Sequence, residues 1–242
     1  MRTLIVGALA ALAFASAPSL ASAQSGYVGA NYSHVDANGG DGNAWGADAA
    51  IAFPGSGSIG FELDAAYSDP EDGDSAVGAT GHVYTRNESH LLGAFVGVAN
   101  SNDNTAWDVG VEGSLYRDNW TFAGDVVYAN DDDANADAWG ADVAARYFVT
   151  DNARLQARAG WANVSPDAGD DQDVWDVGVS GEYQFASLPV SLGLAYDHIE
   201  TDSDDADAVS VEARWNFGGG TLKDRDRHGA SQADLTGILN RL

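Results

Sequence analysis

The sequence predicts an all-β fold: a closed, antiparallel, up-and-down transmembrane β-barrel of about twelve strands, with about ten to fourteen compatible with the pattern. Three observations lead to this prediction. Apolar and polar residues alternate with period two through most of the chain, aromatic residues bracket the apolar face, and long acidic connections alternate with short ones. A soluble β-sandwich would explain the alternation, but it would leave the aromatic brackets without a reason.

The N-terminal segment, residues 1–23, is predicted to be a signal peptide and is excluded from the fold. Arg2 supplies a positive start, TLIVGALAALAFA is apolar, and ASA at 21–23 is a small-residue cleavage site before Gln24. A membrane anchor is the alternative, but the apolar run is short against the ~20 residues that a spanning helix needs. Secretion with cleavage is favoured, and we expect no transmembrane helix in the mature chain.

Twelve candidate strands of about ten residues follow, and this length suits a tilted crossing of a bilayer. Their connections alternate between a longer acidic kind, such as NDDDANAD at 130–137, and a shorter kind, such as RDN at 117–119. Strands that run up and down then place the acidic connections at one rim and the tight turns at the other. The strands are predicted near 26–35, 44–53, 59–68, 76–86, 90–99, 106–116, 120–129, 138–148, 154–164, 174–185, 190–199 and 208–217.

One face of the predicted strands is apolar, with small aliphatic residues in the middle and aromatic residues at the ends. Strand 138–148, for example, has Trp139 and Tyr147 at the two ends of this face. Amphipathic rings prefer the headgroup level of a bilayer, and a Lys or Arg in the middle of the band would cost ~2–4 kcal/mol. We therefore predict a lipid-facing surface whose aromatic girdle consists of Trp45, Tyr67, Trp107, Trp120, Tyr128, Trp139, Tyr147, Trp161, Trp175, Tyr183, Tyr196, Trp215 and Phe217.

The opposite face carries the charges, and closure of the barrel makes it the wall of a lumen. Carboxylates outnumber arginines there, which predicts a water-filled path that enriches cations; the alternative is a lumen whose charges pair with one another and conduct little. Strand 90–99 is an exception without inward charge, which indicates either a plug contact or a different register. The predicted lumen-lining and selectivity residues are Asp48, Glu62, Asp64, Arg86, Asp108, Glu112, Asp125, Asp142, Arg146, Arg158, Asp176, Glu182, Asp197, Glu212 and Arg214.

Together these features resemble a Gram-negative outer-membrane β-barrel protein, similar in size and strand number to a small porin. The resemblance rests on the signal peptide, the asymmetry of the rims, and a repeated hairpin in which Trp follows an acidic connection, as in AWGADAA (44–50) and AWGADVAA (138–145). It also rests on VSVEARWNF (209–217), which is similar to the C-terminal strand that the outer-membrane assembly machinery recognises. In such barrels the terminal Phe is usually the last residue, whereas residues 218–242 follow Phe217 here.

The resemblance implies a location in the cell outer membrane and contact with its lipids and lipopolysaccharide. It also implies recognition by the assembly machinery and passive diffusion of small hydrophilic solutes through the lumen of the barrel at 24–217. A non-conducting structural anchor or surface interaction barrel is the main alternative, and the oligomeric state stays open.

Residues 218–242 differ from the barrel and are predicted to be a periplasmic tail. Ser231 is expected to cap a short helix with Leu235, Ile238, Leu239 and Leu242 on one stripe. Three interpretations compete: a mostly disordered tail, which is favoured, an amphipathic helix at the membrane rim, and a basic plug in an acidic lumen. The last rests on the concentration of basic residues in the tail, which are Lys223, Arg225, Arg227 and Arg241.

Composition and motifs argue against several other functions. A formal net charge of -26 disfavours a nucleic-acid partner, and the absence of Cys removes disulfides and thiolate metal sites. Acidic connections such as DPEDGDS (69–75) offer oxygen ligands to Ca²⁺ or Mg²⁺ but lack the spacing of an EF-hand, so solvated loops are favoured and no metal or cofactor is predicted. Of the five His only His82 points inward by pattern, and no Gly-x-Ser-x-Gly motif occurs, so no enzyme is expected.

Overall fold

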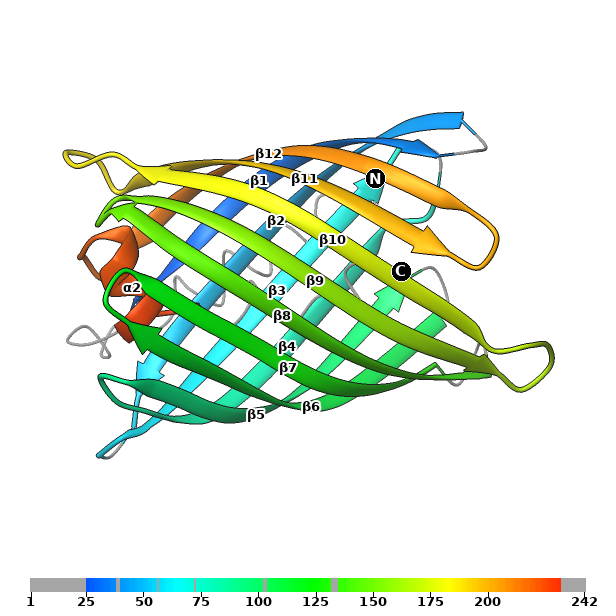
Figure 1. Ribbon diagram of the computed structural model, residues 1–242, viewed down its shortest axis with the longest axis horizontal. Helices are drawn as coiled ribbons and strands as arrows, with labels where there is room; N and C mark the ends of the chain where they lie inside the picture. Colours follow the sequence, from blue (N-terminus) through cyan, green and yellow to red (C-terminus); the bar gives the residue numbers. More distant parts are fainter. Residues whose placement is uncertain are drawn as a thin grey trace, which may run out of the picture.

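The computed structural model describes residues 25–37, 40–55, 57–71, 73–101, 104–131 and 135–231, and these residues form a closed antiparallel β-barrel (Figure 1). The predicted fold class is confirmed, and the strand number within these ranges is twelve. The strands are β1 (Ser25–Ala37), β2 (Gly40–Pro54), β3 (Ile59–Pro70), β4 (Ala76–Arg86), β5 (His90–Ser101), β6 (Asn104–Arg117), β7 (Trp120–Asp131), β8 (Ala136–Thr150), β9 (Ala153–Pro166), β10 (Gln172–Gln184), β11 (Val190–Thr201) and β12 (Asp205–Phe217).

Each strand pairs with its neighbours in sequence, and the pairing of β1 with β12 closes the barrel. That last ladder runs in register from the pair Gly26–Phe217 to the pair Ala37–Ala206. Closure matters because a bilayer offers no hydrogen-bond partner to an unpaired N–H or C=O group. The terminal strand that ends in Trp-x-Phe therefore satisfies the free edge of the first strand.

The two faces of the strands differ as the sequence predicts. In β10, the side chains of Trp175, Val177 and Val179 are more than half exposed on the outside, whereas Asp176 and Glu182 are buried in the interior. The predicted girdle residues all have the outward parity of their strands, and many contact one another across strands. The ring centroids of Trp107 and Tyr128, for example, lie 5.6 Å apart, and those of Trp120 and Tyr147 lie 4.7 Å apart.

Strand lengths differ from the prediction of about ten residues, since the strands range from 11 residues in β4 to 15 in β2. Where a connection was expected over 36–43, β1 continues to Ala37 and β2 begins at Gly40. Gly, Asn and Asp at these positions suggested turns, but antiparallel pairing continues past the apolar band because it satisfies the backbone groups. The acidic rim is therefore built largely from strand ends, and the two rims differ more in charge than in the length of their connections.

The inward face of β5 carries no charge, and its predicted register is the one that the structure has. Leu91 and Phe95 are buried inside, whereas Leu92 and Val96 lie outside and are about 60% exposed. The glycines between them make room for carboxylates of β6: a Cβ on Gly93 would lie 2.6 Å from Glu112 Oε1, and one on Gly97 would lie 2.5 Å from Asp108 Oδ2. The uncharged inward face of β5 therefore accommodates carboxylates that project from β6.

A short helix, α2 (Leu222–His228), follows β12 at the end of the barrel where the tight turns lie (Figure 1). Its signal in the sequence is a capping box, in which the Thr221 side chain accepts a hydrogen bond from the backbone N–H of Asp224 and the Asp224 side chain accepts one from the backbone N–H of Thr221. This helix was not among the predicted elements. The helix predicted beyond Ser231 and the predicted signal peptide lie outside the described residues. Among the residues that the structure does describe, no helix is long and apolar enough to span a membrane.

The apolar outer band predicts a large difference between two adjacent substitutions in the middle of β10. Val179→Arg places a charge on the outer face and should lower the free energy of unfolding by ~2–4 kcal/mol in a bilayer. Ser180→Arg places the same charge in the water-filled interior and should lower it by much less. Denaturant unfolding in lipid vesicles measures both values, and equal losses would contradict the assignment of the two faces.

Candidate functional site

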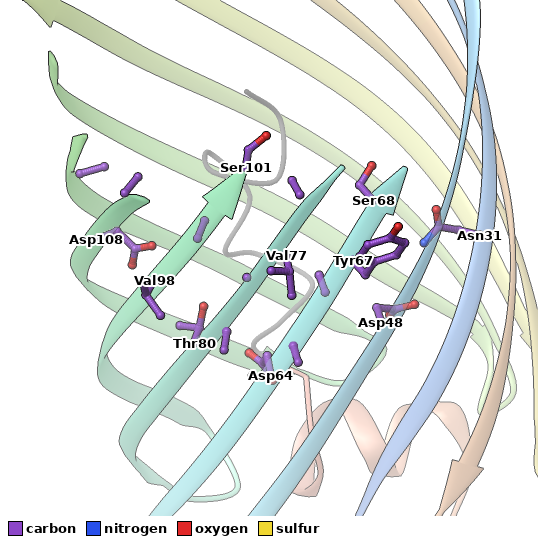
Figure 2. A pocket seen from close by; sticks show the side chains of 18 of the residues that line it. Asn31, Asp48, Asp64, Tyr67, Ser68, Val77, Thr80, Val98, Ser101 and Asp108 are labelled. Carbon is purple, nitrogen blue, oxygen red and sulfur yellow. The ribbon is translucent and has the colours of Figure 1, made fainter. Parts of the chain in front are cut away.

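The interior of the barrel contains a cavity of about 970 Å³ that extends from the acidic rim toward the middle of the strands. Figure 2 shows Asp48, Asp64 and Asp108 on its wall, with the helix in pale red beyond its floor. Nine Asp or Glu residues and three Arg residues contribute to its lining. The cavity is therefore polar and acidic, as the charged parity of the strands predicts.

Three arginines, Arg154, Arg158 and Arg214, come from one side of the barrel, and the wall supplies each with carboxylates. Arg158 on β9 contacts Asp197 at 2.6 Å and Asp176 at 3.1 Å. Arg214 on β12 contacts Asp48 at 3.2 Å and also pairs with Glu212. Because these groups are partly shielded from bulk water, their mutual attraction is stronger than that of a surface pair.

The opposite wall, on β3 to β7, contributes Asp64, Asp108 and Asp125 to the cavity without an arginine among its lining residues. Asp108 lies over the hollow at Gly97 and is only 7% exposed. Asp125 lies directly opposite Glu112 on β6 and Asp142 on β8 in the strand register. The cavity thus has one wall of mixed charge and one acidic wall, and an electric field crosses the space between them.

Below the cavity, a buried histidine on β4 joins a carboxylate of the neighbouring strand β3 to a carboxylate of β6, which lies beyond β5. The Nε2 atom of His82 lies 2.7 Å from an oxygen of Asp64, and its Nδ1 atom lies 3.1 Å from Glu112. The side chains of His82 and Glu112 are fully buried. The imidazole satisfies two carboxylates that would otherwise face each other in a poorly solvated region, so it holds this part of the wall together.

The predicted lumen residues all face inward, but they divide into two groups. The first group lines the cavity: Asp48, Asp64, Asp108, Asp125, Arg158, Asp197, Glu212 and Arg214. The second group lies outside that lining and consists of Glu62, Arg86, Glu112, Asp142, Arg146, Asp176 and Glu182, all of them buried except the half-buried Arg86. Several members of this group contact the C-terminal segment, and the role of both groups in selectivity stays a prediction.

The C-terminal segment, residues 221–231, closes the tight-turn end of the interior. Its central contact is Asp226, whose Oδ1 atom accepts a hydrogen bond of 2.7 Å from Arg146 and whose Oδ2 atom accepts one of 2.7 Å from Thr121. Arg146 and Asp226 are each about 1% exposed. Removing one member of such a pair leaves the other charge buried, which typically costs ~3–5 kcal/mol.

A second group of contacts surrounds Arg225 on the other side of the helix. Arg225 donates hydrogen bonds to the side chains of Gln184 and Asn216, and its guanidinium lies 3.7 Å from Glu182. Glu182 also accepts a hydrogen bond of 2.9 Å from Arg154. Arg154 is a residue of the inward parity that sequence reasoning missed, although its spacing from Gln156 and Arg158 on the same strand could have revealed it.

Residues after the helix extend the closure across β3 and β4. Arg86 donates hydrogen bonds to the backbone carbonyl of Gly229 and to the side chain of Ser231, and the backbone N–H of Ser231 donates to Glu62. A small space of about 10 Å³ is lined by residues of the segment and of the wall. Among the described residues, the segment lies across the tight-turn mouth in contact with several strands.

The contacts of residues 221–231 correspond to the plug, one of the three interpretations of the tail. The charges differ from the simple picture of a basic plug, because the most buried pair combines an acidic residue of the helix with an arginine of the wall. At the exposed start of the helix, the backbone N–H and side chain of Thr221 hold the pKa of Asp224 below its ordinary value. This cap is therefore fully formed at neutral pH and weakens only as acid protonates Asp224.

No group of three or more His, Cys, Asp or Glu side chains in the described part of the chain is arranged to hold a metal ion. The described parts of the acidic connections, which offered oxygen ligands in the sequence, therefore form no cluster of three metal ligands.

Comparison with known proteins supports the fold. No family model and no curated protein sequence matches the chain. Among solved structures, an outer membrane channel from Pseudomonas putida F1 is 12% identical with a TM-score of 0.62, covering 81% of this chain and 96% of that one. The β-domain of a Bordetella autotransporter is 13% identical with a TM-score of 0.53, covering 81% and 100%. The KdgM porin, solved in complex with disordered oligogalacturonate, is 9% identical with a TM-score of 0.52, covering 78% and 99%.

These likenesses show the fold, and they agree with the resemblance that the sequence suggested. The chain has the fold of Gram-negative outer-membrane β-barrel proteins, and its closed ladder and apolar outer band fit the predicted location in the outer membrane. Since the three proteins include a channel, a porin and an autotransporter domain, the shared fold does not by itself assign a function.

The histidine bridge makes a prediction about stability. His82→Leu leaves Asp64 and Glu112 buried without their shared partner and should lower the free energy of unfolding by ~3–5 kcal/mol. Thr80→Val is a matched control, since Thr80 faces inward from the same strand but lines the open cavity. Denaturant unfolding of both variants in vesicles measures the difference, and a loss as small as that of the control would contradict the bridging role.

Proposed function

We propose that the chain is an outer-membrane channel that lets small hydrophilic solutes diffuse passively and prefers cations. The observation that carries this proposal is the cavity of about 970 Å³ at the acidic rim, with three times as many carboxylate as arginine residues in its lining. Clusters of carboxylates within low-dielectric walls raise the local concentration of cations and lower that of anions. No chemical step is part of this function.

The proposed preference for cations arises mainly from the acidic wall on β3 to β7. The arginines on the other side are largely neutralised by Asp176, Asp197, Asp48 and Glu212, to which they are paired. Asp108 lies on this wall over the hollow at Gly97, and the wall contributes no arginine to the cavity lining, so the field of this carboxylate reaches the cavity with less compensation. The preference is weak because three guanidinium groups still line the same space.

The surroundings of the barrel follow from the same arrangement. We propose that the apolar band contacts the acyl chains of outer-membrane lipids and that the girdle contacts their headgroups, including lipopolysaccharide at the acidic rim. β12 ends in Trp215 and Phe217, as expected of a strand recognised by the assembly machinery.

A second candidate function is a non-conducting outer-membrane barrel that serves as an anchor or interaction surface. The position of residues 221–231 across the tight-turn mouth favours it, because ion pairs and hydrogen bonds to several strands hold this segment in the path of an ion. The two candidates differ in whether the lumen ever conducts.

Reconstitution of the purified full-length chain in planar bilayers tests the proposed function. We expect stepwise conductance, and in a salt gradient we expect reversal potentials of the sign given by cation preference. Bilayers that stay silent at saturating protein, with folding confirmed by circular dichroism, would favour the non-conducting barrel.

Neutralisation of the acidic wall tests the origin of the preference. Asp108→Asn with Asp125→Asn should lower the cation-to-anion permeability ratio, by about two-fold or more, because the field from this wall decreases. Glu88→Gln with Asp118→Asn removes the same charge from exposed tight turns and should leave the ratio nearly unchanged. A ratio that does not move in the first pair removes these carboxylates from the selectivity role.

A further inference from the structure

The segment that closes the lumen has the features of a movable part. We propose that residues 221–231 are a hinged plug, and that release of Asp226 from Arg146 and Thr121 unseats the plug and opens the tight-turn mouth. The consequence for solute flow rests on the proposed channel function, whereas the movement of the plug does not.

The surface of the wall that holds the plug, its seat, is mainly polar and includes Thr121, Arg146, Gln184 and Asn216. The segment is held by ion pairs and hydrogen bonds to the wall, and its buried apolar side chains are those of Leu222 and Ala230. A buried ion pair gains little over its hydrated partners, because the desolvation of both charges offsets much of their attraction. When the plug leaves, water can solvate the same groups, so the closed and open arrangements can have similar free energies.

Three consecutive glycines link the plug to the barrel. Gly218, Gly219 and Gly220 connect β12 to the helix, with φ values of 92°, 77° and 87°. Glycine adopts this region as readily as its mirror image, so three in a row form a joint that can rotate without steric strain. The joint is placed directly between the last residue of the barrel wall and the cap of the helix.

The contacts that hold the plug are spread around the mouth of the barrel. Asp226 contacts β7 and β8, Arg225 contacts β10 and β12, and Ser231 contacts β3 and β4. Ser25 on β1 also accepts a hydrogen bond from the backbone N–H of Ala230. These contacts come from strands on opposite sides of the barrel, so the segment lies across the mouth. Its departure would therefore open the mouth.

Asp226 is the residue that holds the plug in its closed position. Its side chain is buried and uses one carboxylate oxygen for Arg146 and the other for Thr121. Asp226→Asn keeps the shape of the side chain but leaves the buried guanidinium without its counter-charge. The closed state is weakened in this variant, while the barrel strands keep their own contacts.

The first experiment compares single-channel recordings of the full-length chain with those of Asp226→Asn. We expect the open time of the variant to rise about tenfold or more, as a shift of a two-state equilibrium predicts. Asp167→Asn, an exposed residue at the opposite rim, is the matched control and should behave as the unchanged chain. Removal of residues 221–242 should give a permanently open channel, provided that its circular dichroism matches that of the full barrel.

A reversible cross-link supplies the converse test. The chain has no Cys, and a Cβ on Gly229 would lie 2.2 Å from the Oγ atom of Ser25, so Ser25→Cys with Gly229→Cys brings two thiols together. In the Asp226→Asn background, oxidation should shorten the open time to that of the unchanged chain. Reduction should return the open time to the longer value of the variant. Equal open times in the oxidised and reduced states would overturn the proposal.

Chemical labelling follows the plug independently of conduction. Ser191 is 1% exposed and lies behind Asn216, which Arg225 holds. A Ser191→Cys variant should react with a charged maleimide at least about tenfold faster when Asp226→Asn is added. Faster labelling in a barrel that never conducts would support the plug and defeat the channel function, whereas equal labelling rates with and without Asp226→Asn would overturn the plug.

Discussion

The closed hydrogen-bond ladder is the constraint on which the rest of this structure depends. A bilayer cannot satisfy a free backbone N–H or C=O group, so β1 must pair with β12 and every strand must keep two partners. Once the ladder closes, each side chain faces either lipid or a narrow interior. The outward residues then need to be apolar, whereas charged residues are tolerated only where other charges or water surround them.

Confinement explains the arrangement of the interior. Charged side chains on strands one or two places apart lie within a few ångströms of one another. Many of them form pairs, such as His82 with Asp64 on adjacent strands and Arg158 with Asp197 across β10. Glycines on adjacent strands supply the space for some of these side chains, as Gly97 does for Asp108. Charge that remains less compensated on the acidic wall faces the cavity, and this is the part of the interior available to a passing ion.

The closed mouth and the acidic cavity are both formed by the inward charges of the barrel strands. Several charges that the sequence predicted in the lumen lining contact the C-terminal segment, namely those of Glu62, Arg86, Arg146 and Glu182. A polar seat suits a segment that leaves and returns, because water replaces the lost contacts. An apolar seat would hold the segment more firmly, since its departure would expose apolar surface to water. The same barrel can thus be silent or conducting without any change in its strands.

By itself, the sequence determined the fold class, a strand number of about twelve and the inward or outward direction of most side chains. The period of two is a local property, and closure of the barrel turns its two faces toward lipid and toward the interior. It did not determine where the strands end, because pairing across the barrel extends past the apolar band and overrides the turn preference of Asp36 or Asp41. Nor did it show which inward charges meet. Arg146 and Asp226 are eighty positions apart, and only the curvature of the barrel and the path of the chain after Phe217 bring them to 2.7 Å.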